Sequence, residues 1–490
     1  MQFPIISVIV FTPIVTGMLL FLIPGERKNE IRVAALAAST FALLLSVWVY
    51  FSYDIPEGGY QFVEKYNWLE SLGISFHVGV NGMNAPLVLL TSVVMFTGVL
   101  ISWGIDDRPR EFFAFLFILA TGVFGVFVTL DLFMLFFFYE IAVFPMYLLI
   151  SIWGWKVTRE YAAMKLTLYL FIGSVISLVG ALAMYFSSGL GTFDMVLLEG
   201  AGFTPGFQKL WFPFVFMGFA VLGGIWPFHN WSPDGHVAAP TAVSMFHAGV
   251  LMKLGAFAAL RVGIMLLPEG AKFWMPMIIF LTIVNVVYGA FIAMTQKDFK
   301  YVIGFSSVSH MGLVTMGFAT LNREGMLGAG VQMFSHGVMT ALFFAVVGMI
   351  YDRAHTRQIP ELGGFAKKMP LVALAFIVGG LVSMGMPGFS GFIAEFPIFM
   401  GVWEFKPYIA IIAGISIVIT AAYMIRIISS VFFGKMPEEY ADHIHDVSPL
   451  DKIALALLSV ILIGVGIFPS VMVPLVESGV DHILRLLGGA

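Results

Sequence analysis

Long apolar runs divide this chain of 490 residues, and they constrain its fold more than any other feature. A helix needs about 20 mostly apolar residues to cross a bilayer, where a spanning segment must satisfy its own backbone groups. Charged residues make up 11% of the chain, against roughly 25% in soluble domains. The sequence therefore predicts an all-α polytopic membrane protein with about fourteen transmembrane helices. The predicted spans are 4–23, 31–51, 83–104, 112–130, 132–153, 162–186, 211–229, 240–264, 274–294, 301–320, 326–351, 370–402, 408–432 and 452–469.

Lysine and arginine are distributed unevenly between the loops. With the N-terminus outside, fifteen of them fall in inner loops and six in outer segments, which favours both termini on the outer side. The N-terminal segment has no basic region and no small-residue cleavage site, so we expect a retained first span. We expect the tail 471–487 to lie at the membrane interface. The chain is predicted to reside in a bacterial or archaeal cell membrane.

The longest outer segment, 52–82, has a soluble composition, and its glycines (Gly58, Gly59, Gly73 and Gly79) predict turns. Asp131, at the start of a predicted span, is expected to cap its outer end.

Several kinds of chemistry are not expected in this chain. It contains no cysteine, which excludes disulfides, thiolate-held iron–sulfur clusters and a cysteine nucleophile. No phosphate-binding loop or dinucleotide fingerprint is present, and His229 and His236 lack a metal-ligand spacing. No Lys/Arg-rich run indicates nucleic-acid binding. We therefore expect no catalytic residues, no bound cofactor and no metal.

Two of the predicted spans contain helix breakers. Pro227 interrupts the segment 222–236, and three glycines with Pro387 interrupt 382–396. Interrupted spans in corresponding places of two halves are typical of inverted-repeat transporters. The breaks are five spans apart, which predicts two inverted five-helix repeats. The predicted domains are 1–111 (spans 1–3), 112–265 (first repeat), 266–435 (second repeat) and 436–490 (span 14 and the tail).

A few ionisable residues lie inside the apolar runs, where a charge costs roughly 2.5–3.5 kcal/mol or more. Such residues usually face a protein interior or a hydrated cavity and mark ion or proton paths. Other interpretations are a static salt bridge for Glu140, a Lys165 side chain that reaches the interface, and histidines that only join helices. The predicted relay comprises Glu140, Lys165, Lys253, His310, His336 and Glu395, with His229 and His247 as possible members.

Four segments resemble the antiporter-like membrane subunits of respiratory complex I. They are 226–261, with the order P-F-H-N-W-S-P-D-G-H, A-P-T-A-V-S and a lysine helix; 295–314, with S-S-V-S-H-M-G; 332–344, with Q-M-F-S-H-G; and the glutamate helix 131–150. The sequence G-F-I-A-E-F at 391–396 is similar to the M-type branch, whose broken helix carries a glutamate, here Glu395.

This resemblance implies a proton-translocating subunit of NADH:quinone oxidoreductase. FMN, iron–sulfur clusters and quinone would then belong to partner subunits, and L-, N- and K-type subunits would be neighbours in the bilayer. The implied path starts inside near Lys165, reaches Lys253, passes His310 and His336, and leaves by Glu395.

The chain departs from the family pattern at one position. The family usually carries a lysine on the seventh span, paired with the glutamate of the fifth, but this position is Leu222. We expect either Lys165 or water to serve Glu140 instead.

Three alternative functions remain open at this point. The first is a subunit of an Mrp-type Na⁺/H⁺ antiporter, which would need oxygen ligands converging on a dehydrated cation. The second is the equivalent subunit of a membrane hydrogenase or of a deazaflavin- or ferredoxin-driven complex. The third is a structural spacer whose first channel is retired.

Overall fold

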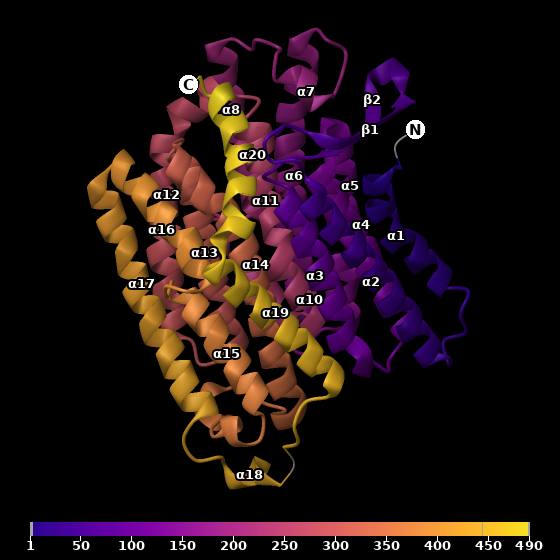
Figure 1. Ribbon diagram of the computed structural model, residues 1–490, viewed down its shortest axis with the longest axis vertical. Helices are drawn as coiled ribbons and strands as arrows, with labels where there is room; N and C mark the ends of the chain where they lie inside the picture. Colours follow the sequence, from indigo (N-terminus) through magenta and orange to yellow (C-terminus); the bar gives the residue numbers. More distant parts are fainter. Residues whose placement is uncertain (1–2, 443, 489–490) are drawn as a thin grey trace.

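The computed structural model describes residues 3–442 and 444–488, and most of them lie in helices that run side by side (Figure 1). The helices are α1 Ile5–Leu20, α2 Lys28–Ser52, α3 Ala85–Ile101, α4 Pro109–Val128, α5 Leu132–Trp153, α6 Arg159–Ser188, α7 Met195–Leu198, α8 Pro205–Leu222, α9 Trp231–Ala238, α10 Thr241–Phe246, α11 Met252–Ala258, α12 Pro268–Thr295, α13 Phe299–Ala319, α14 Arg323–Ala354, α15 Pro370–Ser383, α16 Ser390–Phe405, α17 Pro407–Ile427, α18 Glu438–Ala441, α19 Pro449–Ile467 and α20 Val473–Leu486.

Eleven helical stretches within the described residues are long and apolar enough to cross a membrane, and each coincides with a predicted span. The other three predicted spans correspond to shorter helices. α1 has 16 residues, the seventh run ends early as α8, and the long run 370–402 is divided into α15 and α16. The helices therefore indicate a membrane protein with at least eleven spans, and the three remaining predicted spans are short or interrupted helices.

A two-stranded sheet corrects the all-α prediction. In the segment 52–82, β1 (Gln61–Leu69) pairs antiparallel with β2 (Ile74–Val80). The physical reason is the richness of both strands in aromatic and β-branched residues, with Gly73 turning between them at φ +67°. Gly58 and Gly59 also have positive φ, as expected of turns, but the turn predicted at Gly79 is wrong because this residue lies in β2.

The first predicted break is present. α8 ends at Leu222 and α9 begins only at Trp231. The backbone groups freed between them find side-chain partners: the Asn285 amide donates to the Gly224 carbonyl (3.0 Å), and the Trp231 indole donates to the Val221 carbonyl (3.0 Å). Asn285 also accepts from the Trp226 amide. Non-helical backbone is stable at membrane depth when its polar groups are satisfied within the protein in this way.

The second break is present as well. α15 ends at Ser383 and α16 begins at Ser390. Gly385 and Gly388 between them have φ of +63° and +91°, a region that favours glycine. A side-chain carbon on Gly391 would lie 2.0 Å from the Val382 carbonyl oxygen, so the two half-helices meet closely here.

The eighth span contains two wide turns. Between Thr241 and Ile264 the helix is α-helical in α10 and α11 but π-helical at His247–Leu251 (η3) and Ala259–Ile264 (η4). Lys253 lies in α11, the seven-residue α-helical stretch between these wide turns. Single π turns within helices are frequent at functional sites.

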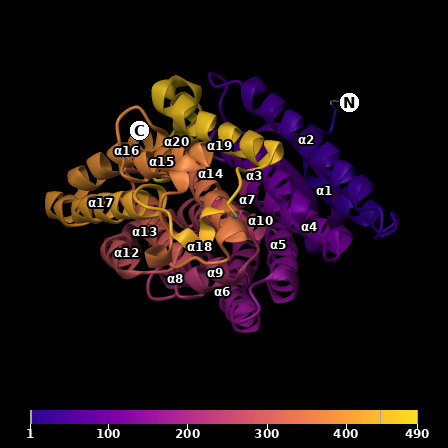
Figure 2. The same cartoon turned by 90° about the horizontal axis from the view of Figure 1, so that it is seen from below.

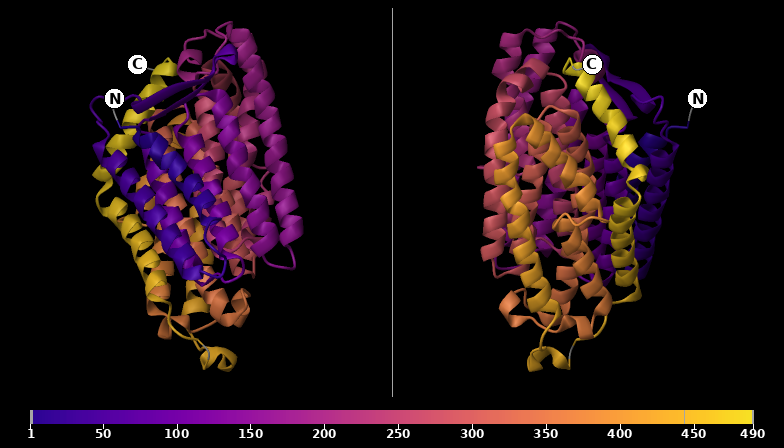
Figure 3. Two further views of the ribbon diagram at one scale, coloured as in Figure 1. Left: turned by 90° about the vertical axis from the view of Figure 1, so that its right-hand side faces the viewer. Right: turned by 60° about the vertical axis from the view of Figure 1, so that its left-hand side comes forward.

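The helices are arranged around α14. Every residue in the most apolar stretch of α14 is buried, and the same holds for the most apolar stretch of the eighth span, Thr241–Ile264. Seen end-on, α1 and α2 lie at one flank and α17 at the other (Figure 2). The hairpin, α7, α20 and both ends of the described chain lie at one end, and α18 lies at the opposite end (Figure 3). Termini at the same end agree with an even number of crossings.

The tail forms α20, which is held at this end by charged contacts. Arg323 on α14 contacts Glu477 (3.0 Å) and Asp481 (2.6 Å), and His482 lies 3.2 Å from Glu199. One side of the helix, which includes Val476, is buried. The predicted interfacial tail is therefore an amphipathic helix packed on the protein.

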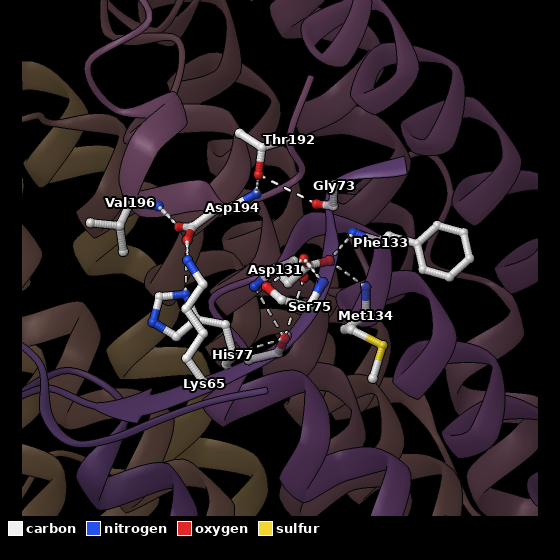
Figure 4. A network of polar contacts seen from close by, with 11 residues as sticks. Lys65, Gly73, Ser75, His77, Asp131, Phe133, Met134, Thr192, Asp194 and Val196 are labelled. Carbon is white, nitrogen blue, oxygen red and sulfur yellow. Dashed lines mark hydrogen bonds and ion pairs between the residues drawn. The ribbon is translucent and has the colours of Figure 1, made fainter. Parts of the chain in front are cut away.

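Two aspartates join the hairpin to the ends of α5 and α7 (Figure 4). Asp131 caps α5 as predicted, accepting from the Phe133 and Met134 amides, and it also accepts from the Ser75 amide of β2 (2.9 Å). Asp194 caps α7 and contacts Lys65 (2.6 Å) and His77 (3.1 Å), which face each other across the hairpin.

Burial alone would raise the pKa of Asp194, but hydrogen bonds from His77 and Lys65 outweigh it and hold this pKa well below its usual value of 3.8. A lowered pKa in the folded protein means that ionised Asp194 stabilises the fold above about pH 3.8, and this contribution is lost as the pH falls below that value. We expect Asp194→Asn to lower the free energy of unfolding at pH 7 by about 1–3 kcal/mol. Thermal unfolding of the purified protein measures this, and the difference should shrink at pH 3. Asp106→Asn is the control, because the Asp106 side chain is 70% exposed. Equal melting temperatures for Asp194→Asn and the parent at pH 7 would contradict the prediction.

Candidate functional site

A lysine and a histidine meet at the centre of the protein. The Nζ of Lys253 on α11 lies 2.8 Å from the Nδ1 of His336 on α14, and both side chains are buried. Lys253 also donates to the Ala248 carbonyl within its own helix. At 2.8 Å one of the two nitrogens must donate and the other accept, so the contact holds one shared proton. The two side chains can exchange a proton with each other while both stay buried.

A histidine and a glutamate meet next to the second break. The Nδ1 of His310 on α13 lies 3.0 Å from the Oε1 of Glu395 on α16, and the Gln332 amide donates to the same oxygen (3.1 Å). The Nε2 of His310 lies 3.0 Å from the Ser383 hydroxyl at the end of α15. A carboxylate accepts only, so Nδ1 of His310 is the donor toward Glu395. Breaking the helix here brings the acid within reach of the base.

These two pairs lie next to each other. The ring centroids of His310 and His336 are 5.3 Å apart. The Nε2 of His336 and the Oε1 of Gln332 are buried and have no hydrogen-bond partner among the described residues. Lys253, His336, His310 and Glu395 therefore form one line across four helices, with a single step that requires an intermediary such as water.

Two further histidines lie in contact beside the first break. The rings of His236 on α9 and His247 are tilted against each other with centroids 3.9 Å apart, and His247 stacks on Trp231 at 5.1 Å. Ser232 lies 3.0 Å from Nε2 of His236, whereas His247 has no hydrogen-bond partner within the described chain. His229 contacts Tyr288 edge-on and is likewise without a partner there. Neither His229 nor His247, the two possible relay members, is hydrogen-bonded to the line from Lys253 to Glu395 in the described residues.

Glu140 and Lys165 lie on the flank of the molecule, and they do not pair. Glu140 is exposed, and its Oε1 accepts from Ser174 (2.8 Å). Lys165 contacts Asp234 at 2.7 Å instead. The expectation that Lys165 serves Glu140 is thus wrong in this structure. The physical reason is that α9 folds back from the break and presents a carboxylate to Lys165.

Several residues of the site were not foreseen from the sequence. They are Asp234 and Tyr301 around Lys165, His236 beside His247, and Gln332 and Ser383 around the Glu395 pair. For Gln332 a signal was available, because it precedes His336 by one helical turn and so shares its face. The serines near His310 join helices through their hydroxyls: Ser309 donates to the Val286 carbonyl, and Tyr423 donates to Ser306.

A cavity of about 630 Å³ opens at the end of the molecule predicted to lie inside. Lys300, Asp352 and Arg357 are among its charged lining residues. The buried Nζ of Lys300 reaches from it to the Ala239 carbonyl (2.7 Å) and the Ser244 hydroxyl (3.3 Å). Ser244 in turn donates to the His236 carbonyl (2.8 Å). Polar groups therefore extend from this cavity to the backbone of His236, one of the two histidines beside the first break.

Comparison with known proteins gives one consistent family. Residues 129–420 match the family described as NADH:quinone oxidoreductase/Mrp antiporter, transmembrane. The chain is 35% identical to NAD(P)H-quinone oxidoreductase chain 4 of Gloeobacter violaceus, over 99% of this chain and 93% of that one. It is 36% identical to NADH-quinone oxidoreductase subunit M of Rhodobacter capsulatus, over 98% and 96%.

Solved structures show the same fold. A chain of respiratory complex I from Thermus thermophilus with bound NADH superposes with a TM-score of 0.91 at 26% identity, covering 99% of this chain and 100% of that one. A chain of the Mrp complex from Dietzia superposes with a TM-score of 0.89 at 19% identity, covering both chains fully, a level that indicates shared fold alone.

Proposed function

Because this chain belongs to the NADH:quinone oxidoreductase/Mrp antiporter membrane family, we propose that it is a proton-translocating membrane subunit of an NADH:quinone oxidoreductase. The observation that carries the proposal is the buried line Lys253–His336–His310–Glu395, with contacts of 2.8 and 3.0 Å at its two ends. Redox chemistry belongs to partner subunits, which hold FMN, iron–sulfur clusters and quinone. L-, N- and K-type membrane subunits are its neighbours.

In this proposal protons reach the line from the inner side. The cavity beside Lys300 collects them, and Ser244 and the histidines at positions 236 and 247 lead toward Lys253. The proton then passes from Lys253 to His336, crosses by water to His310, and leaves by way of Glu395. Neutral imidazole both donates and accepts, so each histidine can pass a proton on.

Charge changes at one member would drive the next step. One unit charge at ~4 Å is worth roughly 4 kcal/mol at an effective dielectric constant of 20. This energy corresponds to a change of about a thousand-fold in proton affinity. A neighbouring charge that appears and disappears is therefore sufficient to load and unload Lys253.

The finer architecture is part of the same proposal. The chain crosses the cell membrane fourteen times, with both termini outside. The two inverted repeats comprise 112–265 and 266–435, flanked by 1–111 and 436–490. The presence of a break in each predicted repeat supports this division.

The exposure of Glu140 supports a neighbouring subunit on the flank of α5 and α6. Glu140 lies in mid-span, and the exposed side chains next to it on α5 are Phe137 and Phe144. A carboxylate facing lipid is costly. A partner subunit that covers this face removes the cost and can place a cation against Glu140, which Leu222 in this chain cannot do.

Transport with and without sodium tests the proposal. We expect the intact complex, reconstituted in vesicles, to acidify one side at the same rate per NADH oxidised in sodium-free and sodium-containing medium. The reason is that the buried line consists of proton-exchanging nitrogens and one carboxylate rather than converging oxygen ligands. Fluorescence of a pH-sensitive dye measures the rate, and an uncoupler provides the zero. Transport that stops in sodium-free medium would favour the antiporter instead.

A further inference from the structure

Each broken helix is followed by a carboxylate paired to a base from another helix. Asp234 lies 12 residues after Leu222, the last residue of α8, and Glu395 lies 12 residues after Ser383, the last residue of α15. Asp234 contacts Lys165 at 2.7 Å, and Glu395 contacts His310 at 3.0 Å. The first break therefore carries an acid–base pair of its own, although the lysine that the family usually has near this break is replaced by Leu222.

Three elements that are distant in sequence build this first pair. Lys165 comes from α6, Asp234 from α9, and the hydroxyl of Tyr301 on α13 donates to the second carboxylate oxygen of Asp234 (2.9 Å). The side chains of Lys165 and Asp234 are 19% and 24% exposed. Lys165 lies six residues inside α6, about 9 Å from the first residue of that helix.

A purely structural role explains this arrangement poorly. Half-buried ion pairs at membrane depth are expensive, and a static pair adds little to stability beyond what apolar packing would supply. The freed carbonyls of Gly224 and Val221 at the break accept instead from neutral groups, the amide of Asn285 and the indole of Trp231. A charged pair that can gain and lose a proton gives a reason for its presence.

α9 links the pair to the buried histidines. This eight-residue helix carries Asp234 toward Lys165 and His236 into the interior, where His236 is fully buried and its ring contacts that of His247. A side-chain carbon on Gly235, between them, would lie 2.7 Å from the His247 ring. α9 therefore fits tightly between the ion pair and His247, and a shift on one side moves the other.

We propose that Lys165, Asp234 and Tyr301 form a second proton-handling group, and that α9 transmits its charge state to the histidines beside Lys253. This inference rests on the proposed function and adds residues that the line from Lys253 to Glu395 does not contain. A proton that arrives at Asp234 forms an O–H bond on the carboxylate. Lys165 keeps its own proton, so the group gains one positive charge until Asp234 releases the proton again. Tyr301 remains protonated throughout and holds the carboxylate in place.

Asp234→Asn in the intact complex, reconstituted in vesicles, tests the inference. The amide cannot accept the proton, and we expect about five-fold less proton pumping per NADH oxidised, the lower end of ordinary coupling between sites. Asp234→Glu should restore most of the pumping, and the exchanged pair Lys165→Asp with Asp234→Lys should restore part of it. Glu269→Gln is the matched control, because Glu269 also contacts a lysine at 2.7 Å but lies at an exposed helix end.

An infrared difference spectrum distinguishes protonation of Asp234 from a purely structural role of this residue. A protonated carboxyl band should appear on activation and disappear in Asp234→Asn, with Glu269→Gln unchanged. If Asp234→Asn does not assemble, Tyr301→Phe decides, since it keeps the ion pair: reduced pumping supports the inference, and parental pumping overturns it.

The outcomes separate this inference from the proposed function. Parental pumping in Asp234→Asn, together with loss of pumping in Glu395→Gln, overturns the inference and leaves the proposed function standing. Parental pumping in both variants overturns the proposed function as well.

Discussion

Lys253→Ala is expected to reduce proton pumping per NADH oxidised by roughly 100-fold, the size of effect typical of a positioned proton-transfer group. Lys253 is fully buried and shares a proton with His336 at 2.8 Å. Alanine removes both the proton carrier and the charge that alters its neighbours. Acidification of vesicles measures pumping, and NADH consumption in the presence of an uncoupler measures the redox reaction separately.

Two control variants sharpen this result. Lys253→Arg keeps a cation but cannot release its proton, so it should abolish pumping as well. Lys406→Ala changes an exposed lysine between α16 and α17 and should leave pumping unchanged. Intact pumping in Lys253→Ala would instead indicate a structural spacer.

Glu395→Gln is expected to reduce pumping by roughly 100-fold, because an amide cannot accept the proton that His310 donates across 3.0 Å. Glutamine has nearly the same shape as glutamate and can still accept from Gln332, so packing at the second break should change little. Pumping and redox activity are measured as for Lys253. The melting temperature and subunit content of the complex report whether the variant assembles.

Glu404→Gln provides the comparison for Glu395. Glu404 lies on the same helix, α16, but near its exposed end, where it accepts from Asn322 (3.2 Å). The Glu404→Gln variant should pump protons at the rate of the parent. Glu395→Asp should recover part of the activity, since the carboxylate is kept but drawn back by one methylene. Full pumping in Glu395→Gln would overturn the proposed function, because the proposed line leaves by way of this residue.

Apolar length and helix breakers made most of the fold predictable. Eleven spans follow from runs of about 20 apolar residues, and both breaks follow from proline and glycine within such runs. The hairpin was missed because the segment 52–82 was read from its composition and turns alone. The π turns around Lys253 leave no comparable signal in the sequence, since they depend on how the neighbouring helices pack.

The candidate site was predictable residue by residue, but its pairings were less so. Buried ionisable residues in apolar runs indicated Lys253, His310, His336 and Glu395, which the structure brings together. The pairing of Lys165 with Asp234 was not predictable, because it joins residues 69 positions apart through a short helix that folds back after the break. The exposure of Glu140 depends on the position of α5 within the bundle, which periodicity in a uniformly apolar helix does not reveal.

The two wide turns on either side of Lys253 have a mechanical consequence. Their hydrogen bonds join residues five apart instead of four, so the helix is wider and less tightly wound on both sides of the seven residues of α11. If η3 tightens while η4 widens, α11 between them can rotate about the helix axis while the two ends of the span keep their positions. Such a rotation would move the ammonium group of Lys253 from one neighbouring helix toward another without any movement at the ends of the span.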